Sequence, residues 1–239
     1  RACTPNVISC NAAILACGKG GRWELAVGLL AEMDRRGLSP DAMSFNSVIN
    51  ACARGGQWEG ACAVLASMEQ GHLAPSVVSC NVVVSACGEA GQWQHALYLF
   101  ERMTGTSCAL DASSYSAAIA AFGGGLQWPL AVATLEVVGV QGCRPHVIAY
   151  NAAISACGMC AQWEQALGLL AAMRKHDLVP DVISYSAAMS ACGKWGLWES
   201  SLALLAELRR RSLAPDVISY NAAMSACERG GQWERALGM

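Results

Sequence analysis

Residues 20–26 read GGRWELA, and the same pattern returns as GGQWEGA at 55–61 and as AGQWQHA at 90–96. The tryptophan of this pattern recurs every 35 residues without insertion or deletion: Trp23, Trp58, Trp93, Trp128, Trp163, Trp198 and Trp233. A fixed period of this length indicates one supersecondary unit that is copied and stacked. We therefore interpret the chain as a repeat array.

Two further columns confirm the register. Prolines and cysteines keep the same spacing, except at Leu110 and Phe122: Pro5, Pro40, Pro75, Pro145, Pro180 and Pro215; Cys17, Cys52, Cys87, Cys157, Cys192 and Cys227. A single array thus spans 1–239, with the tail of a preceding repeat at 1–6, six repeats at 7–41, 42–76, 77–111, 112–146, 147–181 and 182–216, and a partial repeat at 217–239. Because the chain lacks an initiator methionine and begins and ends inside repeats, we expect it to be a segment of a longer protein.

The composition is apolar without membrane-spanning stretches. Apolar residues make up 54% of the chain and charged residues 14%, and the mean hydropathy is +0.32. No stretch reaches the roughly 18 to 20 uninterrupted apolar residues that a membrane-spanning helix needs. Small alanine and cysteine side chains instead suit closely stacked helices. We expect neither membrane association nor a small-molecule substrate.

The thirteen cysteines do not predict a disulfide scaffold. Six of them occupy one repeat position, and stacked helices lie ~8–10 Å apart, beyond the ~7 Å that a disulfide allows between Cα atoms. We expect this column to hold buried free thiols in a reducing, intracellular compartment. Cys157 and Cys160 have C-x-x-C spacing but no second cysteine or histidine pair, so we assign no metal and no cofactor.

Each repeat contains two apolar stripes with helical spacing. In the fifth repeat the stripes are Val147, Tyr150, Ala153, Ile154 and Cys157, then Trp163, Ala166, Leu169, Leu170 and Met173. Asp181 follows a chain break and stands where the N-cap of the next helix belongs. Paired helices, near 7–18 and 22–35 in the first repeat, predict an all-α, right-handed α-solenoid (superhelix) of helix-turn-helix pairs with a 35-residue period.

The fifth position of the repeat is polar throughout. It holds Asn11, Asn46, Asn81, Ser116, Asn151, Ser186 and Asn221. Helix interiors disfavour asparagine and serine, because these side chains compete with the backbone for hydrogen bonds. Positions 2, 9 and 12 share a helix face with position 5, and we expect this face to lie apart from the core. It is the candidate functional surface.

Three segments resemble the pentatricopeptide repeat family. They are VISYNAA at 217–223, GGQWERAL at 230–237, and the pattern M-x-x-x-G-L-x-P-D at 33–41. The resemblance covers the whole chain, and it implies binding of single-stranded RNA with one base per repeat. It also implies that the fifth and last residues of each repeat read the base, that the second residue clamps it, and that the protein acts in a mitochondrion or chloroplast, in RNA processing, stabilisation, splicing, editing or translation.

The resemblance assigns a base to each complete repeat. The pairs are Asn11 with Asp41 for uracil, Asn46 with Ser76 for a pyrimidine, cytosine above all, Asn81 with Asp111 for uracil, Ser116 with His146 for a purine, Asn151 with Asp181 for uracil, and Ser186 with Asp216 for guanine, and Asn221 opens the next site. The implied RNA is 5′ U-C-U-purine-U-G 3′. The chemistry agrees, because serine leaves room for a larger base, and a carboxylate only accepts hydrogen bonds and so favours a base edge with an N–H. Ser76 can donate instead.

The remaining RNA contacts are also implied by the resemblance. Base-clamping residues would be Ile8, Met43, Val78, Ile148, Ile183 and Ile218, and Ser113 would be a poor clamp. Phosphate contacts would come from position 13, at Lys19, Arg54, Lys194 and Arg229. Glu89, Gly124 and Met159 interrupt that line, and the net charge is −2. Because phosphate contacts supply much of the affinity for nucleic acid, we expect modest binding.

Other functions are weighed against RNA binding. The aspartates before each first helix are also N-caps, so the two roles coexist. The tryptophan column is typical of helix packing, and Trp195 is interpreted as incidental. The four histidines form no cluster with metal-ligand spacing, so we expect no enzyme within this segment, although a catalytic domain could lie outside it. The alternative function is a protein- or peptide-binding scaffold without RNA binding.

Overall fold

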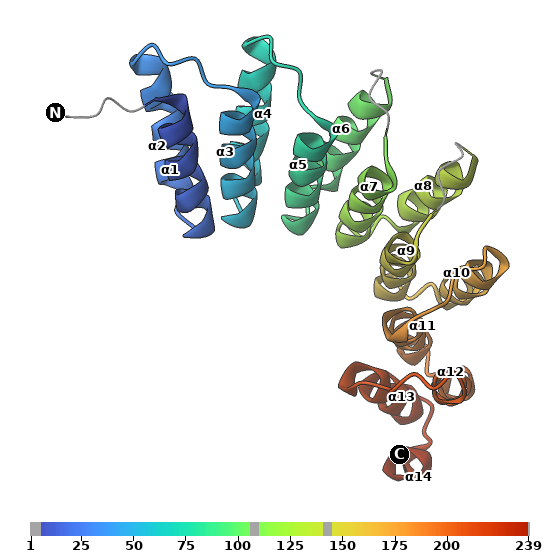
Figure 1. Ribbon diagram of the computed structural model, residues 1–239. Coiled ribbons are helices and arrows are strands. Elements are labelled where there is room, and N and C mark those ends of the chain that lie inside the picture. The colour runs from blue at the N-terminus through green and yellow to red at the C-terminus, as the bar shows by residue number, and fades with distance from the viewer. Residues whose placement is uncertain (1–5, 106–109, 141–144, 239) are drawn as a thin grey trace. The chain divides into compact units, whose positions relative to one another are not determined.

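A computed structural model describes residues 6–105, 110–140 and 145–238 (Figure 1). All regular elements in this part of the chain are α-helices, two per repeat. They are α1 (Val7–Lys19), α2 (Trp23–Arg35), α3 (Ala42–Arg54), α4 (Trp58–Gln70), α5 (Val77–Glu89), α6 (Trp93–Gly105), α7 (Ala112–Gly124), α8 (Trp128–Val140), α9 (Val147–Met159), α10 (Trp163–Lys175), α11 (Val182–Lys194), α12 (Trp198–Arg210), α13 (Val217–Arg229) and α14 (Trp233–Leu237). The predicted helix pairs are confirmed.

The chain forms two compact units, residues 1–121 and 122–239, with the same internal construction. In the first unit α1 packs against α2 and α3, and α3 packs against α4 and α5. In the second unit α9 packs against α10 and α11, and α11 packs against α12 and α13. Within each unit the first helix of a repeat therefore contacts both its own partner and the first helix of the next repeat, as in the predicted α-solenoid. No helix among the described residues is long and apolar enough to cross a membrane.

The first helix of each repeat begins at a side-chain cap. Asp41 accepts a hydrogen bond of 2.8 Å from the backbone N–H of Ser44. The hydroxyl oxygen of Ser44 in turn accepts a hydrogen bond from the backbone N–H of Asp41. Asp181 and Ser184 form the same capping box before α11. Such caps satisfy backbone donors that have no partner within the helix. The N-cap role expected of the aspartates is confirmed at these helices.

Neighbouring first helices approach closely at a small residue. A Cβ atom on Gly88 of α5 would lie 2.5 Å from the Cα of Ala121 in α7, and one on Gly18 of α1 would lie 3.2 Å from the Cβ of Ala51 in α3. Position 12 therefore lies between helices. The expectation that it belongs to a face apart from the core is wrong, because the repeats stack more closely there than any larger side chain permits.

The tryptophan column packs between successive repeats. A Cβ on Gly55 would lie 2.6 Å from Cδ1 of Trp23, and the rings of Trp58 and His95 are 4.8 Å apart. These contacts confirm that the tryptophans pack the helices. Trp195 is exposed, and its Nε1–H donates a hydrogen bond of 2.6 Å to the carbonyl oxygen of Ala161 in the preceding repeat.

The cysteine column lies inside the helix stack. Five of its members are fully buried, Cys52, Cys87, Cys157, Cys192 and Cys227, and Cys17 is half-buried. Phe122 takes the equivalent place in the fourth repeat and is also buried. Burial raises the pKa of the Cys157 and Cys192 thiols to about 11. The Cys160 thiol of the C-x-x-C pair instead donates to the carbonyl oxygen of Leu126 at 3.3 Å.

Candidate nucleic-acid interface

The second position of the repeat carries exposed apolar side chains. Ile8 is 77% exposed and Val78 is 67% exposed, and the other members of the predicted clamp are similar: Met43, Ile148, Ile183 and Ile218. Ser113 is also exposed. Single exposed apolar residues are common, but a regular row of them, one per repeat, is a candidate binding surface. Each unit thus presents one such side chain on every first helix except α7.

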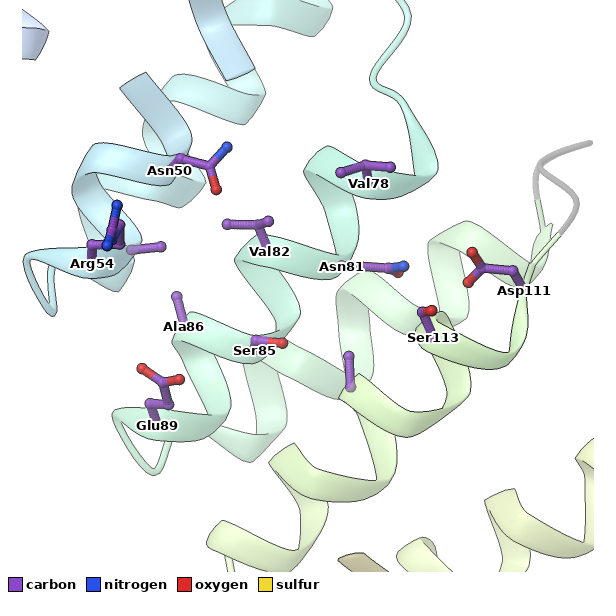
Figure 2. Close-up of a pocket in the computed structure, with 12 residues that line it drawn as sticks. Asn50, Arg54, Val78, Asn81, Val82, Ser85, Ala86, Glu89, Asp111 and Ser113 are labelled. Carbon is purple, nitrogen blue, oxygen red and sulfur yellow. The ribbon is translucent and has the colours of Figure 1, made fainter. Parts of the chain in front are cut away.

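A groove runs between successive first helices beside these residues. In the first unit a cavity of about 470 Å³ is lined by Val78, Asn81, Arg54, Asp111 and Ser113 among others (Figure 2). In the second unit a cavity of about 310 Å³ is lined by the same repeat positions, at Ile218, Asn221, Lys194 and Arg229. The predicted clamp, base-reading and phosphate positions therefore converge on one type of groove.

In the first and fifth repeats the predicted base-reading residues are hydrogen-bonded to each other. The Nδ2 of Asn11 donates to Oδ1 of Asp41 at 3.1 Å, and the Nδ2 of Asn151 donates to Oδ1 of Asp181 at 3.1 Å. The asparagine lies on the first helix of its repeat, and the aspartate caps the first helix of the next. Stacking of the two helices brings together residues that are far apart in the sequence.

A third residue, which the sequence analysis missed, completes this arrangement. Ser44 donates its hydroxyl hydrogen to Oδ1 of Asn11 at 2.6 Å, and Ser184 donates to Oδ1 of Asn151 at 2.5 Å. These serines occupy the third position of the following repeat. Their spacing was the available signal, since serine recurs every 35 residues: Ser9, Ser44, Ser79, Ser114, Ser184 and Ser219, with Ala149 as the exception.

Position 5 is less separate from the core than expected. Asn11 is 8% exposed and Asn151 is 9% exposed, and Ser186 is also buried. Asn46, Asn81 and Ser116 are half-buried, and Asn221 is exposed. The buried asparagines meet polar groups, not the apolar stripe, because the next helix brings its cap residues against them.

The second repeat has a hydroxyl chain in place of the carboxylate. Ser79 donates to Oδ1 of Asn46 at 2.5 Å, and the hydroxyls of Ser76 and Ser79 are 2.7 Å apart. A hydroxyl has one hydrogen, so Ser76 must be the donor to Ser79. The expectation that Ser76 donates to a base stays a prediction, and it requires the hydrogen-bond chain to reverse. The Ser76 hydrogen points into the protein unless the Asn46 amide turns over.

The third repeat has an unpaired acceptor in its groove. Asn81 bonds to Asp111 through its side chain, while Ser114 donates to Asp111 at 2.8 Å. Oδ1 of Asn81 is buried and has no hydrogen-bond partner. Figure 2 shows Asn81 between Val78 and the Asp111–Ser113 segment. A buried acceptor without a partner is costly.

The sites of the fourth and sixth repeats differ. Ser116 donates to the carbonyl oxygen of Ala112 in its own helix, and Nδ1 of His146 accepts from the backbone N–H of Ala149 as a cap. Ser116 and His146 belong to different units. In the sixth repeat, Ser219 donates to Asp216 at 2.7 Å, so the Ser186 hydroxyl, 2.8 Å away, donates to Ser219.

Hydrogen bonds keep the aspartates of the interface ionised. The backbone N–H of Ser44 lowers the pKa of Asp41, and the Ser44 and Asn11 side chains add to the effect. Burial alone would raise the pKa of Asp181, but hydrogen bonds from Ser184 and Asn151 outweigh it and lower the pKa. Hydrogen bonds lower the pKa values of Asp111 and Asp216 in the same way. All four are therefore pure acceptors at neutral pH.

The predicted phosphate contacts lie at the C-terminal ends of the first helices. Lys19, Arg54, Lys194 and Arg229 are exposed. Nζ of Lys194 donates to the carbonyl oxygen of Met159 at 2.7 Å, and Nη1 of Arg229 donates to that of Lys194 at 3.0 Å. Cations are favoured at helix C-termini. Their remaining N–H groups are available to a bound anion, whereas Glu89 shares the groove with Arg54 and weakens its field.

Family comparison settles what kind of repeat this is. The PPR repeat family matches residues 5–54 and 145–194, and the PPR repeat matches residues 43–72, 78–108, 183–213 and 218–239. The chain belongs to the pentatricopeptide repeat family. No curated protein sequence matches it.

Solved pentatricopeptide repeat structures share its fold. PPR10 from maize is 23% identical with a TM-score of 0.60, over 96% of this chain and 38% of that protein. PPR10 in complex with an 18-nt psaJ RNA element is 17% identical with a TM-score of 0.66, over 99% and 40%. The PPR domain of Arabidopsis thaliana protein-only RNase P 1, in complex with tRNA, is 13% identical with a TM-score of 0.63, over 78% and 95%. This pentatricopeptide repeat chain thus spans about two fifths of PPR10.

Proposed function

We propose that this chain binds single-stranded RNA and reads one base with each repeat. The observation that carries the proposal is the hydrogen-bonded pair of Asn151 and Asp181, which joins two helices that each carry an exposed isoleucine, Ile148 on α9 and Ile183 on α11. The pair offers a donor and a carboxylate acceptor, which together complement the N–H and carbonyl groups of a uracil edge. The exposed isoleucines offer apolar surfaces for stacking of bases from either side. The RNA-bound pentatricopeptide repeat structures add support from the family.

The proposed recognition sequence is 5′ U-C-U-purine-U-G 3′. The uracil sites belong to the repeats that begin at residues 7, 77 and 147, where an asparagine precedes an aspartate. The second site is a pyrimidine site, and cytosine requires the Asn46 amide to turn over so that Ser76 can donate. The fourth site is the least defined, because His146 is an N-cap and Ala149 replaces the usual serine. We further propose a role in organellar RNA processing, stabilisation, splicing, editing or translation.

The test is a binding titration with labelled oligonucleotides. The RNA U-C-U-A-U-G within an unstructured flank is compared with its DNA equivalent and with a scrambled RNA of the same composition, at two salt concentrations. Tighter binding to the RNA than to both controls is the expected result. Equal binding to all three would reject base reading, and no binding at low salt would favour the alternative, a groove that holds a peptide or protein partner.

A further inference from the structure

The third position of a repeat carries a serine whose hydroxyl reaches the preceding repeat. We propose that Ser44, Ser79 and Ser184 are positioning residues for base recognition: each orients the asparagine amide of the preceding repeat and so sets which edge the base meets. The inference rests on the proposed RNA binding, and it adds a third residue to the two that read each base.

The geometry around Ser184 shows the contact most fully. Its hydroxyl lies 2.5 Å from Oδ1 of Asn151, and Ser184 is completely buried. The other end of the amide, Nδ2, is 3.1 Å and 3.3 Å from the two carboxylate oxygens of Asp181. Both ends of the amide are thus held by residues of one helix start. Ser44 holds Asn11 in the same way, at 2.6 Å.

The chemistry of the three groups fixes the direction of the amide. A carboxylate only accepts hydrogen bonds, so Nδ2 must face Asp181, and Oδ1 must then face Ser184. The single hydrogen of Ser184 has two acceptors within reach, Oδ1 of Asn151 at 2.5 Å and Oδ1 of Asp181 at 3.0 Å, and the shorter contact is to the amide. One N–H of Nδ2 and one lone pair of Oδ1 remain for a base. If Ser184 lost its hydroxyl, Oδ1 would have no partner in this buried place, and the amide would no longer be held on two sides. Discrimination between uracil and cytosine, whose edges differ by exchange of donor and acceptor, would weaken.

In the second repeat, Ser79 is the group that holds the Asn46 amide. The last residue of this repeat is Ser76, so no carboxylate directs the Asn46 amide. The hydroxyl of Ser79, 3% exposed, lies between the two, 2.7 Å from Ser76 and 2.5 Å from Asn46. Reversal of this hydrogen-bond chain, together with an amide flip, would make Ser79 the donor to Ser76 and leave the Ser76 hydrogen free for a base. Ser79 therefore couples the two base-reading residues of this repeat.

A purely structural role of these serines must be separated from positioning. Ser184 also accepts from the backbone N–H of Asp181 at 3.2 Å as part of a capping box, so its loss weakens the start of α11. Ser9 forms the same box with Asn6, at 2.8 Å and 2.9 Å, and is exposed. Among the described residues the Ser9 hydroxyl bonds to Asn6 and to no position-5 asparagine, and the test uses this chain of residues 1–239. Ser9→Ala is therefore a matched control that removes the cap alone.

The experiment measures base preference one nucleotide at a time. Wild type, Ser184→Ala, Ser44→Ala and Ser9→Ala are titrated with RNAs in which the first or the fifth nucleotide of U-C-U-A-U-G is varied through all four bases. Because a well-placed base contact supplies about tenfold discrimination or more, we expect Ser184→Ala to reduce the uracil-to-cytosine ratio about tenfold at the fifth nucleotide only. Ser44→Ala should do so at the first nucleotide only, and Ser9→Ala at neither.

Two outcomes would overturn the inference. The first is that wild type prefers uracil and both serine variants keep that preference within about twofold, or bind all RNAs more weakly by the same factor, as a lost cap would cause. The serines then do not position the amide. If wild type itself shows no base preference, the proposed function fails and the inference falls with it. Thermal unfolding of each variant reports the loss of the cap separately, and the use of two sites keeps the test valid if one variant does not fold.

Discussion

The Nδ2 of Asn151 donates a hydrogen bond to Asp181 at 3.1 Å, although thirty residues and the whole of α10 separate them in the chain. A side chain on one first helix is thereby joined to the cap of the next. The recognition unit that we propose is therefore a junction between repeats, so a substitution at that junction should act on one nucleotide.

Asn151→Ser should change the fifth base from uracil to guanine. The shorter side chain makes room for a purine, while the Asp181 carboxylate still requires an N–H donor, which guanine supplies. The change in preference should be about tenfold or more. It is measured by titration with RNAs that differ only at the fifth nucleotide. Equal effects on all RNAs, or none, would remove Asn151 as a base reader.

Lys194→Ala should weaken binding to every RNA sequence alike. Nζ of Lys194 uses one hydrogen on the Met159 carbonyl and has two left for a phosphate. Loss of one phosphate contact should reduce the salt dependence, the slope of log K against log salt, by about 0.7 for single-stranded RNA. Lys175→Ala, at the end of α10 in the second helix of its repeat, is the control and should leave the slope unchanged.

Gly88→Ala should destabilise the fold by about 1–3 kcal/mol, the usual cost of overpacking. The added Cβ would lie 2.5 Å from the Cα of Ala121, so α5 and α7 would have to separate. Gly28→Ala in α2 meets nothing within 4 Å and should stabilise by about 0.5–1 kcal/mol through helix propensity. Urea midpoints of the two variants check this. A Gly88→Ala variant as stable as wild type would show that the helices can move apart at little cost.

The buried thiols should be unreactive and should make the protein sensitive to alkali. Because burial raises the pKa of Cys157 and Cys192 to about 11, few thiolates form at pH 8 in the folded state. In the unfolded chain the thiols ionise at a lower pH. Their contribution to the free energy of unfolding is therefore complete below the unfolded pKa and falls as the pH rises towards 11. Thiol titration with and without urea, and urea unfolding between pH 7 and pH 10.5, measure the two effects. Rapid native labelling of Cys157 would contradict the burial.

Acid should lower the free energy of unfolding through the interface aspartates. The pKa of Asp41 and of Asp181 is lowered in the folded state, so the stabilisation that they contribute is present above the unfolded pKa and is lost as the pH falls through the folded pKa. Preference for uracil at the fifth nucleotide should therefore persist from pH 7 to pH 5. Asp181→Asn, which can donate, should lose that preference for uracil over cytosine at pH 7. A wild-type preference that disappears near pH 6 would contradict the lowered pKa values.

Much of the fold followed from periodicity. The invariant spacing of Trp23 and its six equivalents predicted one helix pair per 35 residues, because every repeat must bury the same stripe against its neighbours. Asp41 and Asp181 were predictable as N-caps for a similar reason, since an aspartate after proline and before an apolar stripe satisfies helix-start donors locally. Such features depend on residues that are close in sequence or repeat at a fixed interval.

The sequence by itself therefore determined the family and the paired helices, and it predicted the repeat boundaries and the positions of the proposed interface. Only the tertiary structure decided how those positions combine. The distance between stacked helices determined the burial of Asn11 and left no room for a side chain at Gly88. It also brought the hydroxyls of Ser44 and Ser184 to the asparagines of the preceding repeat. The hydrogen of Ser76 points towards Ser79 for the same reason. A hydrogen bond between repeats depends on the separation and rotation of two helices, and no local pattern in the chain specifies these to the fraction of an ångström that a hydrogen bond requires.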